Sequence, residues 1–334
     1  MVLGTPGGTV DLRTGEVRPA AQKDYITKQT SVAPEPGEPT LWLSFLNDAL
    51  GGDADLIRFV QQWFGYSLTG DTREHALAFA YGSGGNGKSV WLNTMTAIMG
   101  DYAVTAALDT FTASRNERHS TELAMLNGAR LVTASETERG KAWAESKLKA
   151  LTGGDPITAR FMARDFFTFQ PRFKLTVAAN DQPSLSTVDD AMRRRFNILP
   201  FVHKPPAPDR TLKDRLRDEH GRILAWAIEG CLDWQANGLV RPQAVTVATA
   251  EYFDAQDVFG QWVGEKCTVD PTDWDTPTRL FESWKSYAQG ASIDAGNSKD
   301  FAGELRRRSF RDDRTGAGRK WVGIALAPDW AGQQ

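Results

Sequence analysis

Four residues in the run "GSGGNGKS" have the types and the spacing needed to hold a phosphate group. Gly82, Gly87, Lys88 and Ser89 satisfy the pattern G-x-x-x-x-G-K-[ST]. Glycines let backbone N–H groups turn inward around an anion, and a helix beginning near Lys88 would point its positive end at the same place. The lysine would supply a point charge to the β- and γ-phosphates, and the Ser89 hydroxyl would bind Mg²⁺. The pattern predicts a nucleoside triphosphate site, against the alternative of a glycine-rich loop that matches by chance.

Acidic and amide side chains follow two apolar segments further along the chain. Glu136 and Glu138 come just after "RLVTAS", where a hydrolase of this kind needs a carboxylate to hold Mg²⁺ and polarise water. Glu136 follows the strand more closely and is the better candidate, although both could be solvated loop carboxylates. Asn180 ends "KLTVAAN" and could orient the attacking water or touch the γ-phosphate. The alternative for Asn180 is an ordinary turn before Pro183.

Three consecutive arginines, Arg193, Arg194 and Arg195, stand directly before the apolar run "FNILPF". An arginine delivered to the γ-phosphate of a neighbouring subunit would stabilise the charge of the transition state and couple the subunits. At most two of the three can face one site. The alternative is a solvated basic turn that pairs with Asp189 and Asp190.

Strands and helices alternate around these residues, which favours a parallel sheet covered on both faces. The apolar patterns predict strands over 76–82, 129–136, 172–181 and 195–201, helices over 88–100 and 143–153, and an inserted β-hairpin within 155–171.

The flanking segments are predicted to be smaller modules. A hairpin around Gly15 and a Pro-rich linker over 31–40 precede two amphipathic helices between 41 and 68, which break at Gly51-Gly52. A helical stretch over 209–238 follows the sheet, and the tail from about 248 reads as helix, helix and a short strand. The predicted division is 1–70, a hairpin and helical segment; 71–205, the nucleotide-binding core; 206–247, a helical connector; and 248–334, a C-terminal domain.

Composition narrows the class of protein further. The net charge of −3 neither requires nor excludes nucleic acid, so any such binding must come from local basic patches. No apolar run reaches the roughly 20 residues that span a bilayer, and the first residues do not resemble a secretion signal. Cys231 and Cys267 lack zinc-ligand spacing. We therefore expect a protein of the bacterial or host-cell cytoplasm, without a membrane partner.

The ordered motifs "GSGGNGKS", "LVTASETE", "LKALTGGDPITAR", "KLTVAAND" and "RRRFNILPF" together resemble the C-terminal helicase half of the phage/plasmid primase family, within the superfamily 3 helicases. The resemblance runs from about Leu12 to Leu326. It implies an α/β P-loop NTPase fold that is AAA+-like, a hexameric ring of identical subunits, and a winged-helix-like C-terminal domain.

By that resemblance, the phosphate loop binds ATP and Mg²⁺, Glu136 is the acidic Walker B element with Glu138 beside it, and Asn180 is the sensor. Arg194 or Arg195 is the arginine finger, although the usual aromatic–Arg–Arg pattern of the family is Arg193-Arg194-Arg195 here. The expected metal ligands are Ser89 and Glu136. The residues expected to contact the nucleotide are Gly82, Gly84, Gly85, Asn86, Gly87, Lys88 and Ser89.

The resemblance also implies where DNA is held. In the family, the hairpin before the sensor strand projects into the ring pore and grips single-stranded DNA. Here Arg160 lies on its rising limb and Arg164 near its tip, and the alternative is that both merely face water. The basic residues of the tail could meet duplex phosphates or form a solvated helix face; they are Lys299, Arg306, Arg307, Arg308, Arg311 and Arg314.

The expected function is an ATP-dependent replicative DNA helicase of a phage, plasmid or integrated mobile element, which moves along single-stranded and forked DNA as a ring. The alternative is an ATP-switched DNA-binding or loader ATPase that does not unwind. A P-loop kinase of small molecules fits the hairpin and the arginines less well. The residues before Leu41 show neither a carboxylate cluster nor a zinc-ligand set. We therefore expect a truncated helicase, or one that is separate from its primase domain, with priming supplied by another polypeptide.

Overall fold

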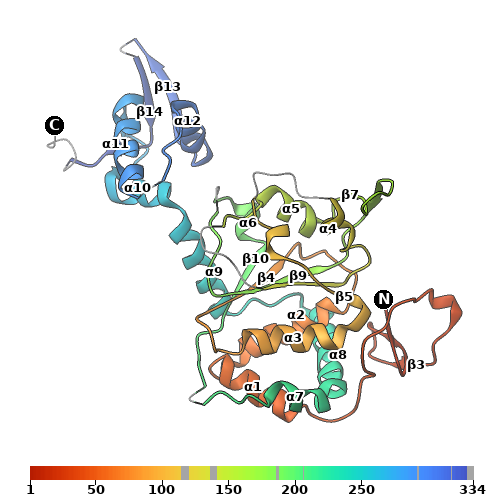
Figure 1. Cartoon of the computed structure of the whole chain (residues 1–334). Coiled ribbons are helices and arrows are strands. Elements are labelled where there is room, and N and C mark those ends of the chain that lie inside the picture. Colours follow the sequence, from red (N-terminus) through yellow and green to blue (C-terminus); the bar gives the residue numbers. More distant parts are fainter. Residues whose placement is uncertain are drawn as a thin grey trace. The chain divides into compact units, whose positions relative to one another are not determined.

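The alternating strands and helices form a parallel β-sheet in the larger of two units (Figure 1). The computed structural model describes residues 1–113, 120–135, 141–185, 188–205, 207–291, 293–316 and 318–328. The chain divides into Met1–Tyr252 and Phe253–Gln334. The sheet of the first unit has the strand order β10-β4-β9-β6-β5, and all its neighbours are parallel. Its strands are β4 (Leu77–Tyr81), β5 (Ala103–Thr105), β6 (Leu131–Ser135), β9 (Lys174–Ala179) and β10 (Phe196–Pro200).

Four of these strands confirm the sequence prediction, and β5 was not predicted. Every residue of β9 is buried, and β4, β6 and β10 are buried over four of their five residues. A strand covered on both faces needs a nearly continuous apolar run, so its pattern is easy to detect. β5 has three residues, none of them buried, and lies at the edge of the sheet, which leaves little pattern to read.

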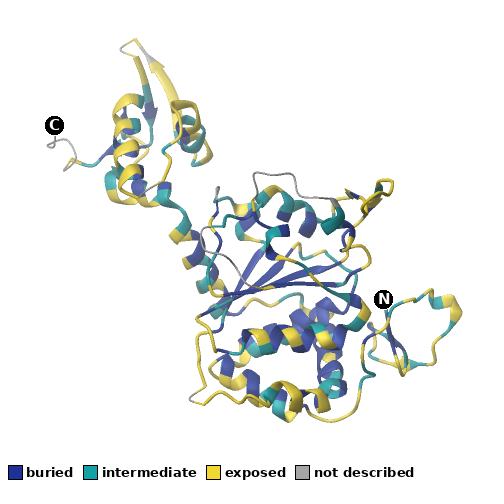
Figure 2. Ribbon diagram, viewed as in Figure 1, coloured by how far each residue is buried: buried dark blue, intermediate teal, exposed yellow. Residues whose placement is uncertain are grey.

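Helices cover both faces of this sheet (Figure 1), and the strands between them are buried (Figure 2). The helices on one face are α1 (Thr40–Ala49), α2 (Ala54–Ser67), α3 (Lys88–Met99), α7 (Leu212–Leu216) and α8 (His220–Asn237). Those on the other face are α4 (Ser120–Ala124), α5 (Glu145–Gly153) and α6 (Asp190–Arg193). The expected helical segment before the sheet and the helical connector after it therefore share one layer.

Glycines allow α2 and α8 to pack closely within that layer. A Cβ atom on Gly65 would lie 2.1 Å from the backbone nitrogen of Cys231, and one on Gly230 would lie 2.3 Å from the carbonyl of Gln61. The indole N–H of Trp63 on α2 donates to the Thr176 hydroxyl on β9 at 2.9 Å. Both helices thus belong to the core of the first unit.

The N-terminal residues form a small antiparallel sheet that is tied to the same core. Its strands are β1 (Val2–Thr5), β2 (Gly8–Asp11) and β3 (Val17–Arg18), so the predicted hairpin is present and gains one strand. Gly4 N–H donates to the Tyr102 hydroxyl at 3.0 Å. The Arg130 guanidinium donates to the carbonyl of Val2 at 2.9 Å and to that of Leu68 at 2.6 Å. One arginine therefore fastens both the first strand and the end of α2.

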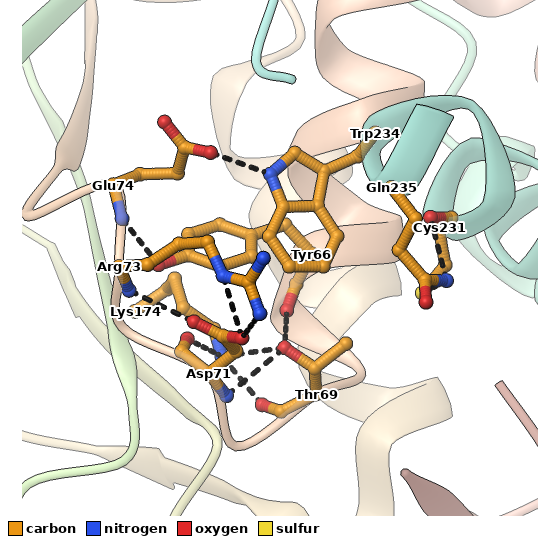
Figure 3. Close-up of polar contacts among 9 residues, drawn as sticks. All are labelled: Tyr66, Thr69, Asp71, Arg73, Glu74, Lys174, Cys231, Trp234 and Gln235. Atoms are coloured by element: carbon orange, nitrogen blue, oxygen red, sulfur yellow. Dashed lines mark hydrogen bonds and ion pairs between the residues drawn. The ribbon is translucent and has the colours of Figure 1, made fainter. Parts of the chain in front are cut away.

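A buried lysine joins the start of β9 to the loop after α2 (Figure 3). The Lys174 amino group donates to the carbonyl of Thr69 at 2.5 Å and to that of Asp71 at 3.1 Å. It also lies 4.6 Å from the centre of the Tyr66 ring. Burial is the main cause that lowers the pKa of Lys174 well below its ordinary value.

The second unit has its own apolar core, which includes Phe259, Trp262, Trp284, Phe301 and Trp321. The tail is richer in elements than predicted, and α9 (Gln243–Gln256) continues from the first unit into the second. The remaining elements are α10 (Val258–Lys266), β11 (Cys267–Thr268), β12 (Trp274–Asp275), α11 (Pro277–Gly290), α12 (Ser298–Arg307), β13 (Arg311–Thr315), β14 (Gly318–Val322) and β15 (Ala325–Leu326). Over the described residues of the whole chain, no helix combines the length and the apolar character that a bilayer crossing requires.

Candidate functional site

The glycine-rich loop connects the end of β4 to the start of α3, as the motif requires. Gly82, Gly85 and Gly87 have positive φ angles of 153°, 82° and 89°, a conformation that glycine adopts without a steric penalty. A Cβ atom on Gly82 would lie 2.0 Å from the Phe201 carbonyl oxygen, and one on Gly87 would lie 2.8 Å from the Phe45 ring. These two glycines are therefore required by packing, whereas Gly84 and Gly85 have open space where a side chain would stand.

Lys88 lies inside this loop and is buried. Its ammonium group donates to the Gly82 carbonyl at 2.6 Å and to the side-chain oxygen of Asn86 at 2.9 Å. The Asn86 amide in turn donates to the Phe201 carbonyl, which fastens the loop to the end of β10. Burial, with a smaller contribution from nearby Lys204, lowers the pKa of Lys88. The loop thus holds a cation at its centre, where an anionic ligand would meet it.

A cavity of about 480 Å³ lies against the loop. Its polar lining includes the loop residues Asn86, Lys88 and Ser89, Asn180, and also Ser44, Asp48 and Asp209. Its apolar lining is Leu41, Phe45 and Ala49 of α1 together with Val90, Pro205, Ala207, Pro208 and Leu212. A nucleotide also combines both kinds of group, because its phosphates are anionic and its base is flat and largely apolar.

The structure brings two of the predicted catalytic residues, Lys88 and Asn180, and the predicted metal ligand Ser89 to this one cavity. Asn180 directly follows β9, which is the neighbour of β4 in the sheet. Parallel strands place their carboxyl ends at one edge, so the side chains meet there. Glu136 and Glu138 lie outside the described residues, although β6, which they follow, is the next strand in the same sheet.

The described residues near the loop fit a nucleotide-bound Mg²⁺ better than a metal site built by the protein alone. The Ser89 side chain is exposed to the cavity. Within the described residues there is no group of three or more His, Cys, Asp or Glu side chains that could hold a metal ion. Ser89 would therefore complete a metal shell that phosphate oxygens dominate.

Arg194 and Arg195 lie at the amino ends of the strands, whereas the loop lies at their carboxyl ends. They precede β10, whose first residue, Phe196, pairs with Leu77 at the start of β4, whereas the loop follows the end of β4. Five strand residues separate these ends by about 16 Å. The arginines and the loop of one chain therefore do not form a single site.

The predicted hairpin consists of β7 (Ile157–Ala159) and β8 (Phe167–Phe169), which pair antiparallel. Arg160 and Arg164 are exposed, and the Arg160 guanidinium lies 4.7 Å from the centre of the Phe166 ring. The tip also exposes Phe161, Met162 and Phe166 (Figure 2). Cations beside exposed aromatic rings are the groups that contact single-stranded nucleic acid in other proteins.

Acidic neighbours pair with several basic residues of the second unit. Arg306 forms an ion pair with Asp312 at 3.1 Å, and Arg308 forms one with Asp257 at 2.6 Å. Arg307 pairs with Glu304. Lys299, Arg311 and Arg314 are exposed, and so are the paired Arg306 and Arg307.

The sequence did not predict the apolar residues that line the cavity. Phe45 and Leu212 lie far apart in the chain, and neither belongs to a motif. The amphipathic pattern of α1 predicts a buried face but does not distinguish a core contact from a ligand contact. The feature appears only when the fold brings α1, Leu212 and the loop to one cavity.

Two family models match parts of this chain. A family of unknown function (DUF5906) matches residues 80–195, which include the loop, Asn180 and the three arginines. A family described as D5 N terminal like matches residues 1–51.

Viral proteins named as helicases are similar to most of the chain. "Putative helicase L207/L206" of Acanthamoeba polyphaga mimivirus is 25% identical over 92% of this chain, which covers 35% of that protein. "Putative helicase 022R" of Frog virus 3 is 27% identical over 66% of this chain and 25% of that protein. The chain thus spans about a third or less of the length of these relatives.

Solved structures of the C-terminal region of NrS-1 share the fold. One has a TM-score of 0.56 and 10% identity, and covers 88% of this chain and 78% of that chain. A second has a TM-score of 0.53 and 12% identity. The likeness supports the mixed α/β architecture with its five-stranded parallel sheet.

Proposed function

We propose that this chain is an ATP-dependent DNA helicase of the superfamily 3 type, with an AAA+-like core. The observation that carries the proposal is the cavity beside the glycine loop, where the buried Lys88 would meet phosphates and apolar residues such as Phe45 and Leu212 would contact a base. The sheet order, with the loop-bearing strand β4 between β10 and β9, is the order expected of that core. The viral relatives that are named helicases also favour this function.

Each group at the cavity has a distinct role in the proposed reaction. Lys88 would exchange its carbonyl partners for phosphate oxygens, and backbone N–H groups around Gly84 and Gly85 would hold the rest of the phosphate chain. Asn180 would orient the attacking water. Ser89 would hold Mg²⁺, which neutralises charge on the phosphates, and Glu136 is the proposed carboxylate beside it.

The remaining parts connect hydrolysis to movement along DNA. The arginines at the amino ends of the strands cannot reach the nucleotide of their own chain, so a ring of copies would complete each site. Arg160 and Arg164 on the β7–β8 hairpin would contact phosphates of single-stranded DNA inside that ring. The second unit is proposed to be winged-helix-like, and a separate polypeptide would supply primers.

Strand displacement on a forked DNA duplex with ATP and Mg²⁺ tests the proposal. The purified chain should separate the strands, its ATPase activity should rise with single-stranded DNA, and Lys88→Ala should lower both activities about 10²–10³-fold. DNA-stimulated hydrolysis without strand displacement would favour a loader or switch ATPase. Hydrolysis that ignores DNA, in a chain that stays monomeric, would exclude both DNA-directed functions and leave a nucleotide hydrolase or kinase.

A further inference from the structure

The three consecutive arginines before β10 have different environments. The Arg195 guanidinium donates to the Ala191 carbonyl at 2.6 Å and to the Thr152 hydroxyl at 3.2 Å, so it is engaged within its own chain. Arg194 has an exposed side chain, and Arg193 is half-buried. Of the two finger candidates, Arg194 is therefore the one that is free to reach outward.

A second cavity, of about 400 Å³, lies beside these arginines. Arg193, Arg194 and Arg241 line it, together with Asp190 and small or hydroxyl-bearing residues of α9 such as Thr249. Three guanidinium groups and one carboxylate give this surface a net positive charge. Guanidinium groups bind phosphate through two parallel N–H···O bonds, which makes a terminal phosphate the ligand that such a cluster fits best.

Arg241 acts on the backbone of this cluster. It precedes α9, and its guanidinium donates to the carbonyl of Arg194. Arg194 is the C-cap residue of α6, which has four residues and gains little stability from its own hydrogen bonds. A cation at the carboxyl end of such a helix satisfies a carbonyl group that lacks a partner in the helix. Arg241 therefore orients the turn from which the Arg194 side chain projects.

We propose that this cavity receives the terminal phosphate of a nucleotide bound by a second copy of the chain. Arg194 contacts that phosphate, Arg193 supports the positive field, and Arg241 is a positioning residue that acts through the Arg194 carbonyl. This inference rests on the proposed function, because it requires nucleotide at the Lys88 loop. Beyond the proposed function, Arg194 is the arginine that crosses the interface, and Arg241, 46 positions beyond Arg195, holds Arg194 in place.

Single variants provide the first test. Arg194→Ala should lower the turnover number about 10³-fold, as expected for an arginine supplied in trans. Arg241→Ala should lower it about 10- to 100-fold through misplacement of Arg194, with KM for ATP and the affinity for an ATP analogue unchanged. Arg241→Lys should restore part of the activity, because its ammonium group can still donate to the carbonyl. Arg13→Ala, which removes an exposed arginine of the N-terminal sheet, is the matched control and should have wild-type activity.

Mixtures of inactive variants test whether the site is shared between copies. A 1:1 mixture of Lys88→Ala and Arg194→Ala should recover up to about a quarter of wild-type turnover, because some interfaces combine an intact loop with an intact arginine. Arg241→Ala should also complement Lys88→Ala. It should not complement Arg194→Ala, because both variants damage the same side of the interface.

The outcomes separate this inference from the proposed function. If the wild-type chain neither binds nor hydrolyses ATP, the proposed function fails. If the wild type is active but Arg241→Ala keeps full turnover, or recovers activity when mixed with Arg194→Ala, the inference is wrong and the function stands. A loss of thermal stability in Arg241→Ala without rescue by Arg241→Lys would reduce Arg241 to a structural residue and would also overturn the inference.

Discussion

Two lysines of the first unit, Lys88 in the glycine loop and Lys174 at the start of β9, both have a buried amino group but differ in their surroundings. Both are buried, at 5% and 1% exposed. Both donate to backbone carbonyls, and burial lowers the pKa of both. The difference lies in what else is near. Lys88 borders an open cavity, whereas Lys174 is closed in by the Tyr66 ring and the loop after α2.

The comparison shows that a buried cation with perturbed protonation is not by itself a functional group. Structural networks shift pKa values as active sites do. What separates the two lysines is access, since a ligand can replace the carbonyls at Lys88 and has no path to those at Lys174. The comparison therefore predicts opposite responses when each lysine is removed.

The largest expected effect is on stability, at Lys174. Lys174→Ala leaves a cavity and removes the donor for the Thr69 and Asp71 carbonyls, so the free energy of unfolding should fall by about 3–5 kcal/mol. Urea unfolding followed by circular dichroism would measure it. Nucleotide affinity at a temperature where the variant is folded should stay unchanged, and a weakened affinity there would break the comparison.

Lys88→Ala should have the opposite profile. Turnover should fall about 10²–10³-fold, the effect typical of removing one preorganised donor to developing charge. The melting temperature should change little, because the loop carbonyls next to the cavity can bind water instead. Steady-state ATPase assays measure the turnover, and calorimetry on the same sample measures the melting temperature. A large stability loss in Lys88→Ala would mean that the two lysines do not differ in role.

Two glycines of the loop sharpen the contrast between packing and access. Gly87→Ala would place a methyl group 2.8 Å from the Phe45 ring on a residue with φ of 89°, so we expect about 1–3 kcal/mol of destabilisation together with weaker nucleotide binding. Gly84→Ala is the matched control, since a Cβ atom there has no neighbour within 4 Å. Equal melting temperatures for the two variants would contradict the loop geometry.

The smallest expected effect is a pH dependence of stability. In weakly alkaline solution the folded chain should hold fewer protons at Lys174 than the unfolded chain does, because burial lowers the folded pKa. Stability therefore rises with pH, by about 1 kcal/mol for each pH unit in which native Lys174 is neutral. The unfolding free energy of the wild type minus that of Lys174→Met, measured from about pH 7 to about pH 9.5, should increase. The pH range ends below 10.0, the ordinary pKa of tyrosine, because burial raises the pKa of Tyr66. Above that pH the unfolded chain loses the Tyr66 proton while the folded chain keeps it, so stability would fall as the pH rises. A flat difference would mean that Lys174 stays charged.

The fold was more predictable than the site. Gly51-Gly52 separates α1 from α2 as the sequence predicted, and the buried strands were predicted from their nearly continuous apolar runs. The loop residues were found because every part of their chemistry is local. Arg241 and Phe45 were missed because each acts across a distance in the chain, through a carbonyl or a ring face, and leaves no pattern nearby. Lys174 was missed because a lysine at the start of a strand is usually solvated.

The contacts of the first strand have a consequence for how the chain is made. Val2 and Gly4 are held by Arg130 and Tyr102, which leave the ribosome roughly a hundred residues later. The first strand therefore depends for these contacts on residues that flank the central strands. Cutting the chain after residue 51, where the D5 N terminal like match ends, would leave the half-buried Arg130 and the hydroxyl of Tyr102 without these backbone partners. The N-terminal sheet is thus coupled to the stability of the first unit and is not an independent module.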